Sequence, residues 1–168
     1  MTKEQGRQER LLQREKIREF DKNWHTCVAN GMEPVETLVK GAYIVFVGIM
    51  MAIPYEKEWS LIISFLGLNS MAVWTYMMQK MFVTENRKSY SIYEKLKYAP
   101  VSRKEIRRVR VEYLVNFLKT PFVVAILAQL LGAWLLNHEI GIANVVYPFL
   151  SQGVYPLALG VLMTYELY

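Results

Sequence analysis

The sequence has few of the residues that build most catalytic and metal-binding sites. It contains one cysteine and two histidines among 168 residues, so an internal disulfide is excluded, and Cys27 with His25 falls short of the ligands that zinc requires. A phosphate-binding Gly-x-x-x-x-Gly-Lys loop, a His-Glu-x-x-His pair and a serine elbow are also missing. Because catalysis needs clustered titratable groups, we expect no enzyme activity, no metal and no cofactor in this chain.

Charge is absent from four long apolar runs, which hold most of the 53% apolar residues. A helix needs about 20 apolar residues to cross hydrocarbon, and a small soluble domain could not bury four such helices on all sides. We therefore predict an all-α polytopic membrane protein, whose first span needs Lys40 to extend its stem toward the headgroups. The four predicted spans are 36–55, 59–81, 111–137 and 142–167.

The basic residues alternate between the segments that connect these runs. Lys and Arg number seven in residues 1–35, one around Lys57, nine in residues 82–111 and none around His138. Since basic loops stay in the cytoplasm, we expect both termini on the cytoplasmic side of the plasma membrane. The net charge of +5 then reflects topology and contact with anionic lipids rather than nucleic-acid binding.

Residues 1–35 precede the transmembrane domain, residues 36–168, and are predicted to form an amphipathic helix. Apolar residues recur there at helical spacing, whereas Asn30-Gly31 breaks the pattern and Pro34 can open the first span. This helix lies either in the inner headgroup layer, with Trp24 at the boundary, or against a cytoplasmic partner. The apolar positions are Leu11, Leu12, Ile17, Phe20, Trp24 and Val28.

The predicted cytoplasmic loop, residues 82–110, contains two helix-start signals. Ser91 with Glu94 and Ser102 with Glu105 each match a capping box. Pro100 lies between them, and because it disfavours helical geometry in the residue before it, the first helix must end near Tyr98. We expect a short helix from Ile92 to Tyr98, a turn, and a second helix from Arg103 that continues into the third span.

The predicted helix from Ile92 to Tyr98 has barely two turns and would not be stable alone in water, so it needs a surface to pack against. One interpretation is an interfacial linker on the bilayer, anchored by tyrosine and lysine. The other is a docking helix for a cytoplasmic protein, with basic residues that pair with the partner's acids or with lipid phosphates. The predicted docking residues are Tyr90, Tyr93, Leu96, Lys97, Arg103, Lys104 and Arg107, with Arg108 and Arg110 also flanking the contact.

The segment "YAPVSRKEIRRVR", residues 98–110, follows this tyrosine-containing helix and precedes the third span. In this it resembles the inner loop of type-2 exporter permeases of the ATP-binding-cassette transporters. The resemblance implies a bacterial plasma-membrane exporter, in which residues 91–99 are the coupling helix gripped by a nucleotide-binding subunit that holds ATP-Mg. It also implies that residues 8–29 are an interfacial helix. Such permeases usually have six spans, so a four-span chain is expected to be a short variant or to pair with a second permease.

Polar residues lie near the middle of three predicted spans, where no acid or base is found. Such side chains either hold helices together or line a substrate path, and the absence of deep charges argues against an ion-coupled carrier. The candidate cavity-lining residues are Asn69, Ser70, Gln129, Ser151 and Gln152.

The last apolar run is too long for one upright span, and Pro148 and Pro156 interrupt it. It forms either a re-entrant outer segment over 142–150 followed by a span over 151–167, or one tilted and kinked helix.

For function, we expect the membrane-spanning subunit of an ATP-driven exporter of an amphiphilic, lipid or peptide cargo. The alternative is a membrane anchor or assembly protein that recruits a partner without transport.

Overall fold

The computed structural model describes residues 3–28, 33–52, 59–85, 88–136 and 141–166. The chain is all-α apart from one small hairpin. In chain order the elements are α1 Lys3–Val28, α2 Glu33–Ala52, α3 Trp59–Met81, β1 Phe82–Glu85, β2 Lys88–Ser91, α4 Ile92–Lys95, α5 Arg103–Leu135, α6 Ala143–Pro148, the π-helical segment η1 Phe149–Val154, and α7 Tyr155–Glu166.

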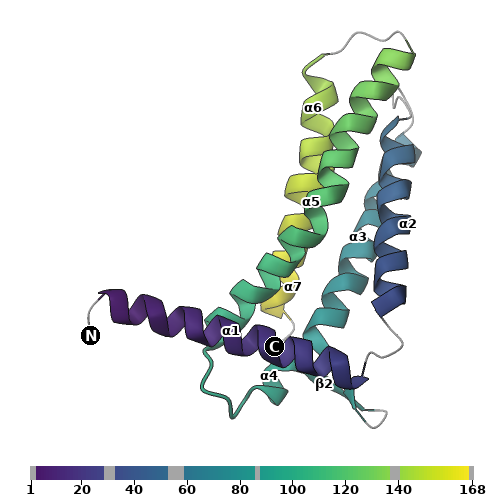
Figure 1. The fold of residues 1–168 in the computed structure, drawn as a ribbon. Coiled ribbons are helices and arrows are strands. Elements are labelled where there is room, and N and C mark those ends of the chain that lie inside the picture. The colour runs from purple at the N-terminus through teal and green to yellow at the C-terminus, as the bar shows by residue number, and fades with distance from the viewer. Residues whose placement is uncertain (1–2, 29–32, 53–58, 86–87, 137–140, 167–168) are drawn as a thin grey trace.

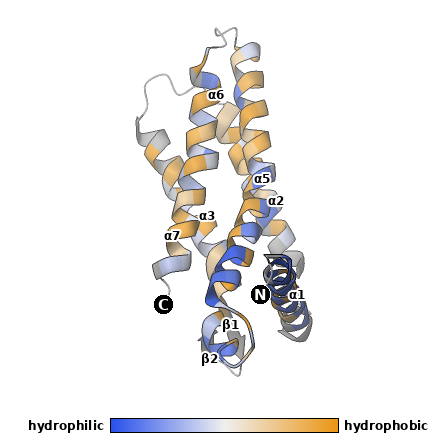
Figure 2. Ribbon diagram, turned by 90° about the vertical axis from the view of Figure 1, so that its left-hand side faces the viewer, coloured by the Kyte–Doolittle hydropathy of each residue, from blue (hydrophilic) through white to orange (hydrophobic). Residues whose placement is uncertain are grey.

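The long helices form an upright bundle with α1 lying across its base (Figure 1). Helices α2, α3, α5 and the run α6–η1–α7 stand side by side, and the N-terminal half of α1 projects beyond them. Hydrophobic residues dominate the upright helices, whereas hydrophilic residues gather at the base, over α1 and the first turns of α5 (Figure 2). The molecule thus has an apolar body and a charged end.

Two helices in the described part of the chain are long and apolar enough to cross a membrane, namely Arg103–Leu135 and Asn144–Tyr165. Only 28% of the apolar window of each is buried by the rest of the protein, whereas the core helix of a soluble protein would be mostly covered. Length and composition therefore point, weakly, to membrane association. A further apolar helical segment, Lys40–Ala52, is shorter than these two helices.

The connection between α3 and α4 contains a β-hairpin that the sequence analysis did not predict. Strands β1 and β2 pair antiparallel, with Phe82 opposite Ser91 and Glu85 opposite Lys88. Helix α4 ends at Lys95 rather than near Tyr98, and the chain continues in turns in which the Ala99 amide donates to the Leu96 carbonyl. The prediction was too long because only the boundary imposed by Pro100 was visible in the sequence. The break predicted at Asn30-Gly31 lies outside the described residues.

The last apolar run is one continuous helical path rather than a re-entrant segment followed by a span. Backbone angles remain right-handed helical at Ile142, Pro148, Phe149 and Tyr155, which flank the successive segments. The proline-containing run changes its hydrogen-bond spacing at η1, and a π-bulge is a recognised cause of helix kinks. Of the two alternatives left by the sequence, the structure shows the single helical run.

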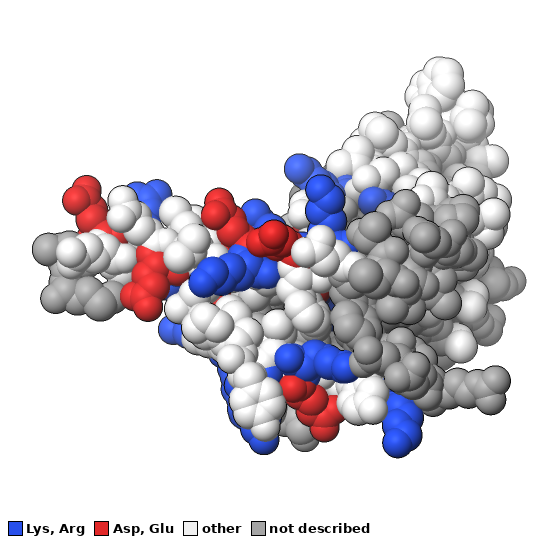
Figure 3. All heavy atoms as spheres, turned by 60° about the horizontal axis from the view of Figure 1, so that its bottom comes forward, with Lys and Arg blue, Asp and Glu red and all other residues white. Residues whose placement is uncertain are grey.

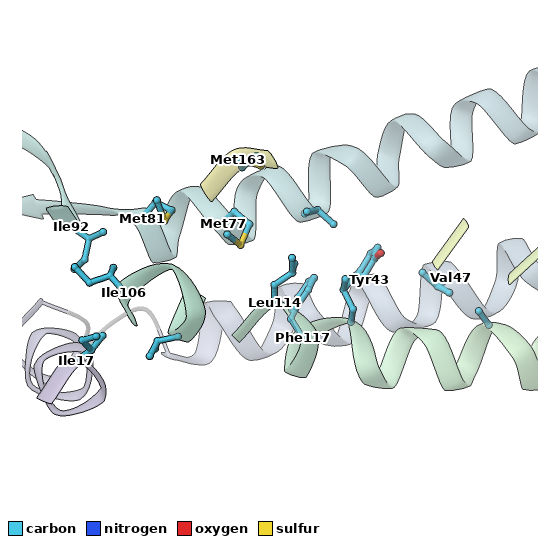
Figure 4. Packing of buried hydrophobic residues seen from close by; sticks show 14 of the residues in the cluster. Ile17, Tyr43, Val47, Met77, Met81, Ile92, Ile106, Leu114, Phe117 and Met163 are labelled. Atoms are coloured by element: carbon cyan, nitrogen blue, oxygen red, sulfur yellow. The ribbon is translucent and has the colours of Figure 1, made fainter. Parts of the chain in front are cut away.

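The core has an aromatic and sulfur-rich centre (Figure 4). The Phe117 ring of α5 stacks between Tyr43 of α2 and Tyr76 of α3, with ring centroids 5.5 and 4.1 Å away. Met77, Met81, Met163 and Leu114 fill the space toward the base, and all are buried. These contacts join α2, α3, α5 and α7 into one packed unit.

Two glycines allow helices to approach closely in this unit. A side chain at Gly132 of α5 would collide with the backbone of Ala52 at the end of α2, and one at Gly160 of α7 would collide with Leu114. Backbone atoms cannot move aside as the end of a flexible side chain can. By contrast, a side chain at Gly67 of α3 would meet nothing within 4 Å.

We expect Gly132→Ala to destabilise the protein by about 1–3 kcal/mol, since it overpacks a backbone contact. Gly67→Ala is the matched control, because it makes the same helical substitution in open space and should be neutral or stabilising by up to about 1 kcal/mol. Thermal unfolding in mild detergent, followed by circular dichroism, measures both. Equal unfolding temperatures for the two variants would contradict the close approach of α2 and α5.

Candidate functional site: the charged platform

We use the name platform for the charged end of the molecule, which comprises α1, the β1–β2 hairpin, α4, the turns over residues 96–102 and residues 103–112 of α5. Seen from below, its surface carries basic and acidic side chains close to one another (Figure 3). Its geometry depends on two helix starts and on an ion-pair network between α1 and α5.

The first helix start matches its predicted capping box. The Ser91 hydroxyl accepts from the Tyr93 amide at 3.3 Å, and the Glu94 carboxylate accepts from the Ser91 amide at 3.1 Å. Two amides that a helix start leaves unpaired are thereby satisfied. This cap explains why a helix of only four residues forms at this point.

The second helix start matches only half of its predicted box. The Ser102 hydroxyl accepts from the Glu105 amide at 3.3 Å, as expected. The Ser102 amide, however, donates to the side-chain oxygen of Gln13 on α1 at 3.3 Å. The Glu105 carboxylate is buried and accepts from Arg14 and Arg108 at 2.6 and 3.1 Å instead. Contacts with α1 replaced the local hydrogen bond that the motif predicts.

A buried ion pair joins α1 to α5 near the bundle. Arg110 donates through both terminal nitrogens to Asp21, at 2.9 and 2.6 Å, and its side chain is 1% exposed. Two parallel hydrogen bonds between a guanidinium and a carboxylate fix direction as well as distance. Helix α1 can therefore cross α5 only at one position and angle without leaving a charge buried alone.

A second set of ion pairs extends this contact toward solvent. Arg14 bridges Glu105 and Glu112 at 2.6 and 3.1 Å, and Arg18 reaches Glu112 at 2.8 Å. The hydrogen bond that Arg14 donates to the Glu105 carboxylate raises the pKa of Arg14 above its ordinary value. Helix α1 supplies both bases and α5 both acids, and because Arg14 and Glu112 each have two partners, the pairs form a network rather than isolated surface pairs.

Apolar contacts lie beneath these charges. Ile17 of α1, Ile92 of α4 and Ile106 of α5 are buried in one cluster (Figure 4). Phe20 packs against the same cluster. Ile17 and Phe20, two members of the predicted apolar face of α1, are therefore covered by other parts of the protein. Leu11 and Leu12 are half exposed, whereas the side chains of Trp24 and Val28 lie outside the described residues.

The predicted docking residues fall into two groups. Leu96 is in the core at 6% exposure, Ile92 packs nearby, and Tyr93 is half-buried against the same cluster. The remaining aromatic and basic positions lie nearer the surface, and three of them are exposed, namely Lys97, Arg103 and Lys104.

Cation–π contacts hold two further predicted docking residues. The Lys95 ammonium lies 4.5 Å from the centre of the Tyr90 ring, and the Arg107 guanidinium lies 4.5 Å from that of Tyr165 on α7. Tyr90 and Arg107 therefore already have partners within the chain, as does Tyr93.

Tyr98 was not predicted as a docking residue, yet it is the most prominent aromatic side chain of the platform. It is 90% exposed, beside the exposed Lys97, whose ammonium lies 5.7 Å from the ring centre. Its place in the turn before Pro100, after the end of α4, explains the exposure. The earlier end of α4 was the missing information, because a longer helix would have placed Tyr98 within its last turn.

Two arginines expected to reach a partner's acids or lipid phosphates contact acids of this chain instead. Arg110 pairs with Asp21, and Arg108 donates to Glu105 at 3.1 Å. Sequence alone could not indicate the pair of Arg110 with Asp21, because these residues lie 89 positions apart. The pair of Arg108 with Glu105 is local, at i and i+3, but the capping box had assigned the Glu105 carboxylate to the Ser102 amide.

Away from the platform, four of the five predicted mid-bundle polar residues form hydrogen bonds between helices. The Asn69 side-chain amide donates to the Ser151 carbonyl at 2.8 Å, and Tyr43 of α2 donates to the Asn69 oxygen and lies 3.2 Å from the Gln152 oxygen. Ser70 contacts the Tyr155 hydroxyl at 2.6 Å.

Gln129 lies apart from that group. It is half-buried, and its side-chain oxygen has no hydrogen-bond partner in the described part of the chain. The structure thus brings together Asn69, Ser151 and Gln152, and adds Tyr43, which sequence counts as an apolar residue of the first span.

No family model matches the chain, and no curated protein or solved structure matches it significantly. Among the residues that the structure describes, no three His, Cys, Asp or Glu side chains are grouped so as to hold a metal ion. The class that the fold defines is an all-α bundle with two apolar helices long enough to cross a membrane.

We expect Arg110→Met to destabilise the protein by about 3–5 kcal/mol, since it leaves the Asp21 carboxylate buried without its partner. The double variant Asp21→Leu with Arg110→Met should recover most of that loss, because both charges are removed. Arg18→Met, which breaks an exposed pair, should cost about 1 kcal/mol or less. Thermal unfolding of the four proteins in one detergent gives the comparison. A double variant as unstable as Arg110→Met would show that α1 is not held by this pair.

Proposed function

We propose that this chain is the membrane-spanning subunit of an ATP-driven exporter. In this proposal the platform binds a separate nucleotide-binding subunit, and the bundle forms part of the path for an amphiphilic, lipid or peptide cargo. ATP and magnesium bind in the partner and not in this chain. The resemblance of residues 98–110 to the inner loop of type-2 exporter permeases suggests the class, and the geometry of α5 is the observation that carries it.

Helix α5 begins in the basic segment after Pro100 and is helical for 33 residues, through Pro121 to Leu135. At about 1.5 Å per residue this is about 50 Å, longer than the roughly 30 Å hydrocarbon core. Its first turns carry the ion pairs to α1, and its remainder packs against α2, α3 and α7. A displacement of the platform would therefore be transmitted along one stiff helix into the apolar bundle.

The membrane arrangement in this proposal has four spans: α2, α3, α5 and the run α6–η1–α7. The platform and both termini lie in the cytoplasm, which agrees with the alternation of basic residues along the sequence. In this arrangement α1 lies at the inner membrane surface, where its exposed Leu11 and Leu12 and its basic residues can contact anionic lipids.

Four helices offer little room for a closed passage, since each is about 10 Å across. We therefore propose that the chain functions with a second permease, either another copy or a different subunit, and that the cargo path lies between them. The apolar outer surfaces of α2 and α3, which include Val45, Ile49, Met71 and Trp74, are compatible with lipid or with such a neighbour.

A second candidate function is a membrane anchor or assembly protein that holds a partner without transport. The hydrogen bonds of Asn69 and Ser70 favour it, because these polar groups are used to join helices as in a bundle that needs only to be stable. Stimulation of the partner's ATPase by cargo distinguishes the two functions, since an anchor would bind the ATPase without changing its rate in response to any cargo.

The proposed topology predicts the side of the membrane on which Ser102 lies. In a Cys27→Ser background, the exposed Ser102→Cys should react with a membrane-impermeant maleimide in inverted membrane vesicles and not in intact cells. The same reagent in intact cells serves as the control. Labelling from outside the cell would remove the platform from the cytoplasm and the exporter proposal with it.

The docking surface is tested by substituting exposed residues of the platform. We expect Lys97→Glu with Tyr98→Ala to reduce the nucleotide-binding ATPase recovered with the chain at least tenfold, since loss of an aromatic anchor at an interface centre costs about 2 kcal/mol or more. Recovery is measured by affinity purification in mild detergent followed by ATPase assay. Leu96 is unsuitable for this test because it is buried.

The matched control changes the same kinds of residue on α1. Lys16→Glu with Leu12→Ala reverses one exposed charge and removes one exposed apolar side chain, and should leave recovery unchanged. An equal loss of recovered ATPase in both variants would indicate general charge attraction rather than docking at the turn that follows α4. Absence of any ATPase from the wild-type preparation would contradict the exporter and leave the anchor.

A further inference from the structure

The helical run on the C-terminal side of the bundle contains a segment with unusual hydrogen-bond spacing. Residues Phe149–Val154 form a π-helix, η1, between α6 and α7. At its end the Tyr155 amide donates to the carbonyl of Leu150, five residues earlier, rather than to that of Ser151. A π-segment accommodates one extra residue in a helix, and such segments are found frequently at functional sites.

The Ser151 carbonyl is left without a helical donor by this arrangement. Its α-helical donor would be Tyr155, whose amide is engaged with Leu150, and its π-helical donor would be Pro156, which has no N–H. The Asn69 side chain of α3 takes the position instead and donates to this carbonyl at 2.8 Å. A buried carbonyl without a donor is costly, so Asn69 stabilises the π-helical form specifically.

Asn69 is itself held by the hydroxyl of Tyr43, which in turn contacts the side-chain amide of Gln152. Tyr43 has one proton to donate and gives it to the Asn69 oxygen. The side-chain amide of Gln152 lies next to the same hydroxyl. If the oxygen and nitrogen of this amide exchange places, the nitrogen donates to the Tyr43 hydroxyl, which satisfies a nitrogen that otherwise has no partner. Tyr43, Asn69 and Gln152 are buried, so a single hydrogen-bond chain runs from Gln152 through Tyr43 and Asn69 to Ser151.

The residue after Asn69 holds the other end of the segment. The Ser70 hydroxyl donates to the Leu66 carbonyl at 2.7 Å and therefore accepts from the Tyr155 hydroxyl at 2.6 Å. Two consecutive residues of α3 thus bind the two sides of the same irregular turn.

We propose that Asn69 is a latch that holds η1 in its π-helical form, and that its release lets the segment become α-helical. In the released form the Tyr155 amide replaces Asn69 as the donor to Ser151. Removing one residue from the helical spacing turns one flanking helix relative to the other by about 100° and shifts it by about 1.5 Å. The switch thereby gives the helical run two discrete arrangements.

The packing of the flanking helices determines which of them turns. Helix α7 is fixed, because Gly160 fits against Leu114, Met163 is buried, and Arg107 lies over the Tyr165 ring. Helix α6 exposes Val145 and Val146 and contacts the bundle through Tyr147, which packs against the core, and the buried Pro148. The moving part is therefore α6, at the end of the bundle away from the platform (Figure 1).

This inference goes beyond the proposed function and does not require the partner to be an ATPase. Its test uses the whole chain in phospholipid nanodiscs, with nitroxide labels at Ile49→Cys and Val146→Cys in a Cys27→Ser background. Both positions are exposed. A turn of 100° on a helix about 10 Å across displaces a label by about 8 Å, which pulsed electron paramagnetic resonance resolves as a second distance.

We expect the parent to show the shifted distance at about 10% or less and Asn69→Ala to raise that population several-fold. Tyr43→Phe keeps the ring stacked on Phe117 and should raise it by a smaller factor. Gln129→Ala, which also removes a mid-bundle amide, should leave the distances unchanged. Deleting Val154 removes the extra residue, so Asn69→Ala in that background should no longer produce the second distance.

An unchanged distance distribution in folded Asn69→Ala would overturn the latch and leave the cluster as helix glue. A second distance that persists after deletion of Val154 would also overturn it, because the motion would then not arise at η1. Size-exclusion chromatography establishes that each variant is folded. If Asn69→Ala does not fold, Tyr43→Phe decides between the same outcomes, with no second distance counting against the latch.

Discussion

The buried ion pair between Asp21 and Arg110 is the constraint on which the arrangement of the charged end depends. An arginine that is 1% exposed cannot remain in the first turns of a helix without a carboxylate to receive both of its terminal nitrogens. The carboxylate is on α1, so α1 must cross α5 at that height. The pairs of Arg14 and Arg18 with Glu105 and Glu112 then set the angle of crossing. Helix α1 and the lower part of α5 consequently form one rigid piece.

This rigidity changes the interpretation of the N-terminal helix. Its composition is that of an amphipathic helix free to lie on a membrane, and the periodicity of Ile17 and Phe20 supports such a helix. In the folded chain that face is already covered by α4 and α5. What remains for lipid or a partner is the projecting half with Leu11 and Leu12. A helix fixed in this way holds the platform in a constant orientation relative to α5, whatever it contacts outside.

Local rules predicted the helices, both serine caps and the position of the buried amides, because each depends on residues a few positions apart. The same rules missed three features. The hairpin over 82–91 is a short pairing without a turn signal of Asn-Gly type. The partner of Arg110 lies 89 positions away. The role of Tyr43 is invisible because a tyrosine counts as apolar until its hydroxyl meets Asn69. Sequence thus indicated which residues are polar and buried, and the fold determined which of them meet.

The two ends of the bundle differ in the kind of contact that holds them, and this difference has mechanical consequences. At the platform, the buried pair of Arg110 with Asp21 permits one arrangement, since a displacement leaves a buried charge without its partner. At η1 a single carbonyl, that of Ser151, can be satisfied either by Asn69 or by the Tyr155 amide, and the backbone loses no hydrogen bond in the exchange. The platform thus has one arrangement, whereas η1 has two alternative hydrogen-bond arrangements. In such a structure a movement of the platform can change which arrangement η1 adopts. Packed interiors favour such discrete alternatives over continuous deformation.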